Sequence, residues 1–178
     1  MKKKMKKLIK ALLLITAIFA LAVPVSAKPS RKTVIKKYDQ WTDKHIFKGQ
    51  YRNPDAYMVD INKDGIPELL VQYENGVRSG LNIYTYKNGK IVRMKSLAGV
   101  NGFEQVRGKK YLAVEWSNGY NDSGYTVYKM SGTKLKQVCK YQLLGYNTYL
   151  RNGQRISQAR FQKFMKTLQT PKFVKWVY

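Results

Sequence analysis

Residues 81–97 have the sequence LNIYTYKNGKIVRMKSL. Aliphatic and aromatic residues alternate with polar ones on either side of Asn88-Gly89, which is the pattern of strands with one buried face. An Asn-Gly pair favours a two-residue hairpin turn because both residues tolerate positive φ. The stretch therefore predicts a β-hairpin with strands over 81–87 and 90–97, and it indicates the class of the surrounding fold.

The same alternation of apolar and polar residues extends over most of the chain, from residue 56 to residue 150. Turn residues interrupt it every eight to twelve positions, which indicates short strands joined by hairpins. The expected strands span residues 56–60, 68–74, 81–87, 90–97, 103–106, 111–117, 125–130, 134–141 and 146–150. Successive hairpins of this kind predict one antiparallel meander sheet of eight to nine strands.

Both flanks of the β region are expected to be helical. Residues 28–50 include a rough apolar stripe formed by Val34, Tyr38, Trp41, Ile46 and Phe47. Thr33 is the expected N-cap of this helix, and Ser157 is the expected N-cap of a second helix over 158–169. The apolar residues of the second helix recur at helical spacing, at Phe161, Phe164, Met165 and Leu168.

Together these elements predict a single α+β domain over residues 28–178, an antiparallel meander flanked by N- and C-terminal helices, with a final strand over 173–178. With 44% hydrophobic and 13% aromatic residues, the chain has enough apolar material for a core, so a wholly disordered chain is excluded. One Cys excludes an internal disulfide and a Cys-cluster zinc site, and one His excludes a multi-His metal site.

Residues 1–27 have the three parts of a secretory signal peptide. The first ten residues include six Lys and no acid, and residues 11–23 are apolar except for Thr16. Pro24 then precedes Val-Ser-Ala27, so cleavage is expected after Ala27. The apolar run of 13 residues is shorter than the roughly 20 that a membrane span needs. We therefore expect a protein that is secreted or associated with the extracellular surface, with no transmembrane segment in the mature chain.

The charge of the chain is strongly positive. It has 34 Lys and Arg against 10 Asp and Glu, and residues 28–178 keep 28 of these cations and all 10 acids. A surplus of this size attracts polyanions. For an exported protein these include wall polymers, acidic glycans and anionic lipid headgroups. No helix-turn-helix, RRM or KH signature is present, so no dedicated nucleic-acid partner is predicted. The sequence does not set the oligomeric state.

Residues 60–68, with the sequence DINKDGIPE, are the strongest local motif. Oxygen-bearing side chains recur at alternate positions, and Gly65 permits a sharp reversal of the chain. Ca²⁺ prefers six to eight oxygen ligands at roughly 2.3–2.6 Å. The expected ligands are the side chains of Asp60, Asn62, Asp64 and Glu68 and the backbone carbonyl of Ile66. An acidic turn with no bound ion is the alternative interpretation.

The motif D-x-N-x-D-G-x-x-E, with strands expected on both sides, resembles the calcium loops of FG-GAP and VCBS-type β-propeller repeats. It is also similar to the DxNxDGxPEL segment of exported proteins of Gram-positive bacteria that have no assigned activity, and the hairpin over 81–90 extends that likeness. An EF-hand would instead place its bidentate acid at the twelfth position, which is Val71 here. The resemblance implies one calcium ion, whose expected role is to hold a hairpin.

Other functional residues are less distinct. Glu104 and Glu115 are candidates for the acid and base of a glycoside hydrolase. His45 is interpreted as a helix-end residue and Cys139 as a buried apolar thiol. The polar loop 118–124, with Tyr120, is a candidate recognition loop.

Three functions therefore stay open. The leading hypothesis is a secreted, calcium-binding, strongly basic and non-enzymatic module that binds an anionic cell-wall or extracellular polymer. The first alternative is a secreted hydrolase of an anionic glycan or wall polymer that uses Glu104 and Glu115. The second is an accessory or inhibitor protein for a secreted partner.

Overall fold

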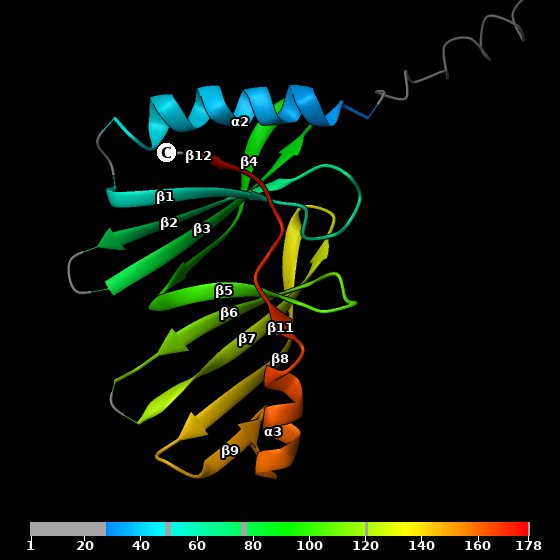
Figure 1. Ribbon diagram of the computed structural model, residues 1–178. Coiled ribbons are helices and arrows are strands. Elements are labelled where there is room, and N and C mark those ends of the chain that lie inside the picture. Colours follow the sequence, from blue (N-terminus) through cyan, green and yellow to red (C-terminus); the bar gives the residue numbers. More distant parts are fainter. Residues whose placement is uncertain (1–27, 49–50, 76–77, 120, 178) are drawn as a thin grey trace, which may run out of the picture.

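The computed structural model describes residues 28–48, 51–75, 78–119 and 121–177 of the chain. In these residues it has two helices and two antiparallel sheets, which confirms the α+β class (Figure 1). The expected signal peptide and its cleavage site lie outside the described residues.

The first sheet, called sheet A, has five strands and lies beneath α2 in Figure 1. Its strand order is β12 (Phe173–Val177), β1 (Arg52–Val59), β2 (Glu68–Asn75), β3 (Arg78–Lys87) and β4 (Lys90–Ala98). The turn between β3 and β4 lies where the sequence places it, because Asn88 and Gly89 both take positive φ, at 50° and 78°. The strands are longer than expected, since β3 begins at Arg78 and β4 ends at Ala98. The expected final strand is present as β12.

The second sheet, called sheet B, has seven strands. Its order is β10 (Gln154–Ile156), β9 (Thr148–Arg151), β8 (Lys134–Leu144), β7 (Asp122–Ser131), β6 (Tyr111–Ser117), β5 (Val100–Val106) and β11 (Leu168–Gln169). The two short strands β10 and β11 are absent from the sequence-based expectation. β10 extends β9 as a small hairpin at the edge of the sheet.

The expectation of one meander of eight to nine strands is wrong, because the sheet breaks between β4 and β5. Gly99, with φ at 67°, turns the chain in the left-handed region at this point. Its amide donates to the Ser79 carbonyl at 2.8 Å, and the Ser79 hydroxyl donates to the Val100 carbonyl. These bonds hold Gly99 and Val100 beside Ser79 of β3, and the chain then continues as β5, a strand of sheet B.

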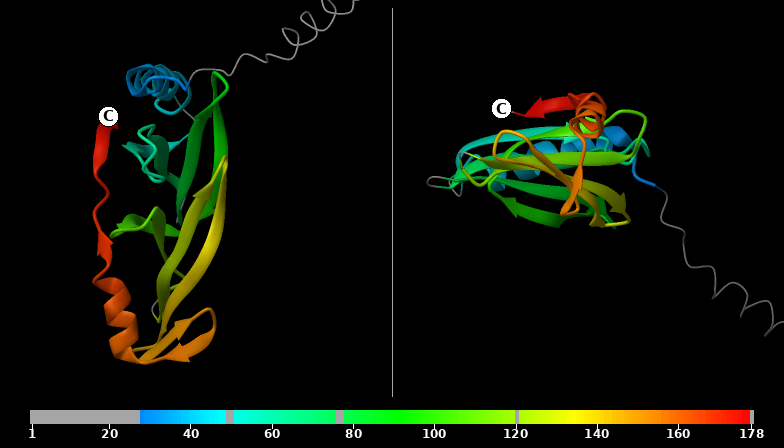
Figure 2. Two further views of the ribbon diagram at one scale, coloured as in Figure 1. Left: turned by 90° about the vertical axis from the view of Figure 1, so that its right-hand side faces the viewer. Right: turned by 90° about the horizontal axis from the view of Figure 1, so that it is seen from below.

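The C-terminal segment connects the two sheets a second time. After α3, β11 pairs with β5 in sheet B, and β12 then pairs with β1 in sheet A. Figure 2 shows this segment running along one side of the molecule from α3 toward α2. Both sheets therefore depend on residues from the end of the chain for an edge strand.

Three apolar clusters give the molecule four layers, in the order α2, sheet A, sheet B and α3 (Figure 1). Successive strand residues point to opposite faces. In β2, Leu69 belongs to the cluster under α2, whereas Leu70 belongs to the cluster between the sheets. In β6, Val114 faces sheet A and Ala113 faces α3. The central strands of both sheets are thus buried on both faces.

Helix α2 (Arg31–His45) packs on sheet A through a single row of residues. Val34, Tyr38, Thr42 and Ile46 follow one another four apart, and each is at most 1% exposed. The buried Thr42 hydroxyl donates to the Tyr38 carbonyl at 2.7 Å, which lets a polar residue occupy this row. The N-cap is Ser30 and not Thr33, because the Ser30 hydroxyl oxygen accepts from the Thr33 amide.

Helix α3 (Gln158–Met165) begins at its expected cap, since the Ser157 side chain accepts from the Arg160 amide. It ends four residues earlier than the sequence suggests. Leu168 and Gln169 pair with Val106 and Gln105 of β5 instead of continuing the helix.

A matched pair of Val substitutions tests the packing of the two sheets. Val114, 3% exposed, lies between them, and Val92, 40% exposed, lies on the surface of β4. We expect Val114→Ala to lower the free energy of unfolding by about 2 kcal/mol, and Val92→Ala by less than about 0.5 kcal/mol. Urea denaturation measures both, and equal small losses would contradict a second sheet over Val114.

Candidate functional site

The predicted calcium loop joins β1 to β2, which are antiparallel neighbours with Val59 opposite Glu68. Lys63 and Gly65 take positive φ, at 57° and 89°, so the chain between the strands curls tightly. Strands lie on both sides of the motif as the sequence predicts, although β1 begins four residues before the expected strand and ends one residue earlier.

The side-chain oxygens of the loop turn toward its own backbone. The Asp60 carboxylate accepts from the amides of Asp64 at 3.1 Å and Gly65 at 2.9 Å. Asn62 Oδ1 accepts from the Asp64 amide at 2.9 Å, and Asp64 Oδ1 accepts from the Ile66 amide at 2.8 Å. A carboxylate has about four lone-pair sites, so one or two amide bonds do not exhaust its oxygens.

Glu68 closes the loop from the first position of β2. It is 1% exposed, and its Oε2 accepts from the Ile61 amide at 3.0 Å. Burial, the largest cause, and the negative charges of Asp64 and Asp60 together raise the pKa of Glu68 to about 8, against the opposing effect of the hydrogen bond from the Ile61 amide. Burial and the negative charge of Glu68 also raise the pKa of Tyr38, which is a residue of α2.

Four of the five predicted ligands line a common cavity of about 390 Å³, namely Asn62, Asp64, Ile66 and Glu68. Lys28 lines it too. Its ammonium lies 3.6 Å from Asp64 Oδ2 and donates to the Asp64 carbonyl. Asp60 is set outside this cavity, where it organises the loop backbone.

The donor set fits a hard divalent cation, because every expected ligand atom is oxygen and three ligands are carboxylates. Glu68 is moreover a buried carboxylate with two acidic neighbours, an arrangement that a bound cation would stabilise. Within the described residues, no group of three or more His, Cys, Asp or Glu side chains is arranged to hold a metal by itself.

Glu104 and Glu115 lie together on the face of sheet B that is turned to α3. Glu115 is opposite Gly102 and Glu104 is opposite Ala113, so the two acids are diagonal neighbours on one face. Burial and the charge of Glu115 raise the pKa of Glu104. Trp116 points to the opposite face, where the Lys140 ammonium lies 3.9 Å from its ring centroid, so it does not accompany Glu115.

The structure also shows what surrounds the remaining candidates, His45, Cys139 and the loop over 118–124. The His45 ring bonds to the Trp41 carbonyl at 2.9 Å and stacks on the Trp41 ring. Cys139 is buried in β8, and burial raises the pKa of its thiol. Of the expected loop over 118–124, residues 122–124 belong to β7, where Asp122 Oδ1 accepts from Gln142 at 2.7 Å, and Tyr120 lies outside the described residues.

A basic groove that the sequence analysis missed lies between α2 and the β3–β4 hairpin. It has a volume of about 460 Å³, and none of its nine described lining residues is acidic. Helix α2 contributes Lys37, Trp41 and Lys44, and the hairpin contributes Tyr86 and Lys90. Figure 2 shows the turn of this hairpin beside α2. The seven-residue spacing of the two α2 lysines, on either side of Trp41, was the available sequence signal.

Comparison with protein-family models, with curated proteins and with solved structures gave no match for this chain. Among the described residues, none of the helices has the length and apolar character to cross a membrane.

Replacing Glu68 by Gln separates the cost of its charge from its role as an expected ligand. Because the pKa of Glu68 is raised, the contribution of this side chain to the free energy of unfolding is complete below pH 4.5 and is lost as pH rises toward 8. With a chelator at pH 8, we expect Glu68→Gln to raise the free energy of unfolding by about 1–3 kcal/mol. This gain should vanish at pH 4. If the variant instead has a lower free energy of unfolding than the wild type at pH 8, the charge of Glu68 does not destabilise the fold.

Proposed function

We propose that this protein is an exported, non-enzymatic module that binds an anionic cell-wall or extracellular polymer in the groove between α2 and the β3–β4 hairpin. The observation that supports it is the composition of the groove, which combines Lys37, Lys44 and Lys90 with Trp41 and Tyr86 and lacks an acid among its described lining. Charged groups of a polymer would face the lysines, and its apolar ring faces would face the aromatic side chains.

The charge balance of the chain keeps such a surface available. From residue 28 onward, 28 cations share 10 carboxylates, so at least 18 cations have no carboxylate of their own. Lys37, Lys44 and Lys90 are all exposed. Exposed cations of this kind attract a polyanion over roughly 8–10 Å at physiological salt.

The aromatic part of the groove is held in place by the core. Trp41 stacks on His45, with ring centroids 5.0 Å apart, and lies 4.7 Å from the ring of Tyr84. Tyr84 is 5% exposed and belongs to the cluster under α2. A ring fixed in this way loses little conformational freedom on binding, which favours recognition of a repeating polymer.

The proposal includes one calcium ion in the loop of residues 60–68, with a structural role. An ion there would offset the mutual repulsion of Asp60, Asp64 and Glu68 and hold the β1–β2 connection.

A hydrolase is the second candidate, because Glu104 and Glu115 share a face and the pKa of Glu104 is raised as a general acid requires. Release of reducing ends from acidic glycans, lost in Glu115→Gln, would favour this activity over simple binding.

Calcium should stabilise the protein measurably. At tenfold its dissociation constant, expected to be on the order of 10⁻⁴–10⁻³ M, the ion adds about 1.4 kcal/mol, or about 3–6 °C in Tm. Differential scanning calorimetry with calcium or a chelator measures the shift.

Two variants sharpen this test. Asp64→Ala should abolish the calcium shift, whereas Lys28→Gln should enlarge it, because the Lys28 ammonium competes for Asp64. A wild-type Tm that is indifferent to calcium would argue against the ion.

Polymer binding is tested by retention on immobilised heparin in a sodium chloride gradient. We expect the triple variant Lys37→Gln, Lys44→Gln, Lys90→Gln to elute at distinctly lower salt than the wild type.

The matched control removes three exposed lysines of the β7–β8 hairpin, as Lys129→Gln, Lys134→Gln, Lys136→Gln. It should elute close to the wild type. Equal losses in both triple variants would mean that overall charge, and not the groove, governs retention.

A further inference from the structure

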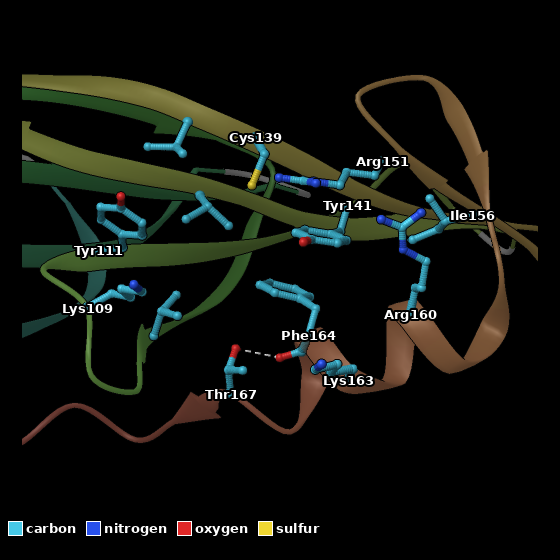
Figure 3. A pocket seen from close by; sticks show the side chains of 13 residues that line it. Lys109, Tyr111, Cys139, Tyr141, Arg151, Ile156, Arg160, Lys163, Phe164 and Thr167 are labelled. Atoms are coloured by element: carbon cyan, nitrogen blue, oxygen red, sulfur yellow. Dashed lines mark hydrogen bonds between the residues drawn. The ribbon is translucent and has the colours of Figure 1, made fainter.

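The largest of the cavities described here lies at the opposite end of the molecule from α2. It has a volume of about 540 Å³ and is enclosed by α3 and by the face of sheet B that is turned away from sheet A (Figure 3). This volume lies within the usual range of small-molecule sites. The polymer groove has no residue in common with it.

The charged residues of this cavity are of one sign. Of its 13 described lining residues, four are cations and none is acidic. Arg160 and Lys163 come from α3, Arg151 comes from β9, and Lys109 comes from the turn between β5 and β6. Like charges gathered around one cavity repel each other, and an anion bound among them would relieve that repulsion.

The interior of the cavity is apolar. Tyr141 and Phe164 stack face to face, with centroids 3.7 Å apart and an angle of 4° between the rings. The Arg151 guanidinium carbon lies 5.7 Å from the Tyr141 ring centroid. Because the facing sides of the two rings are already occupied by each other, the surface left for a ligand includes aliphatic side chains such as Val138 and Ile156.

One apolar side chain of the cavity is also exposed to solvent. Val138, on β8, is 43% exposed and lines the cavity next to Cys139. An accessible aliphatic surface beside exposed cations provides an apolar entrance with a charged rim. This combination excludes a simple inorganic anion as the best occupant, since such an ion would leave the apolar lining unused.

We propose that this cavity binds a single-chain amphiphile with an anionic headgroup, such as a fatty acid or an alkyl phosphate. The aliphatic chain packs against the valine side chains of the cavity, Val138 among them, and the headgroup pairs with Arg160 and Lys163. Arg offers a planar donor fork that matches carboxylate and phosphate oxygens. Neutral and cationic amphiphiles of the same chain length cannot form the headgroup contacts with Arg160 and Lys163.

The test uses cis-parinaric acid, a fluorescent fatty acid, titrated into the full chain below its micellar concentration. We expect saturable enhancement of its fluorescence. Dodecyl phosphate should displace the probe at least tenfold more effectively than dodecyltrimethylammonium, because only the first complements the four cations. Equal displacement by both would overturn the proposal.

Matched variants locate the site. Lys163→Gln and Arg160→Gln should each weaken probe binding by about tenfold or more, whereas Lys166→Gln, an exposed position of the same helix end outside the cavity, should not. Val138→Asp should weaken binding, and Val92→Asp, at a comparably exposed strand position, should not. Identical affinities in each pair would place the probe elsewhere.

Heparin provides the last control. It should leave bound probe in place, because the polymer groove is separate from this cavity. Displacement of the probe by heparin would overturn the assignment of a separate site, whatever the outcome of the retention experiment.

Discussion

From residue 28 onward, 28 positive side chains share 10 carboxylates, and this imbalance constrains the whole molecule. Most cations cannot be neutralised within the chain, so they must stay in water around an apolar core. The four-layer packing makes this arrangement feasible. Burying both faces of the central strands concentrates the core in β2, β3, β6 and β7 and leaves the helices and hairpin turns for the charges.

Several of the few acids face one another, which is unexpected in so basic a protein. Asp60, Asp64 and Glu68 meet in the loop between β1 and β2, and Glu104 lies beside Glu115 on sheet B. Burial, together with the neighbouring negative charges, raises the pKa of Glu68 and of Glu104, which costs stability in the absence of a counter-charge. We propose that a divalent ion bound in the loop offsets the repulsion within the first cluster. Neither proposed anion site has an acid among its described lining residues, although Glu104 and Glu115 lie on the same face of sheet B as the cavity beside α3.

Local features of the fold could be predicted from the sequence. The Asn88-Gly89 turn fixes the ends of β3 and β4, and Ser157 fixes the start of α3. The division into two sheets could not be predicted, because a buried strand such as β6 has the same apolar pattern whichever layer covers it. The loop of residues 60–68 is formed by consecutive residues, so its position between two strands could be predicted. The groove joins Lys44 to Lys90, which are distant in sequence, so only the packing of α2 reveals it.

The most direct test of the account is a map of where an anionic oligosaccharide binds. Backbone amide chemical shifts of the protein would be followed by NMR during titration with a heparin tetrasaccharide at physiological salt. The account predicts that the changes concentrate at residues 37–45 of α2 and 86–91 of the β3–β4 hairpin. Changes of similar size at exposed lysines over the whole surface would contradict it, because charge alone would then explain the binding.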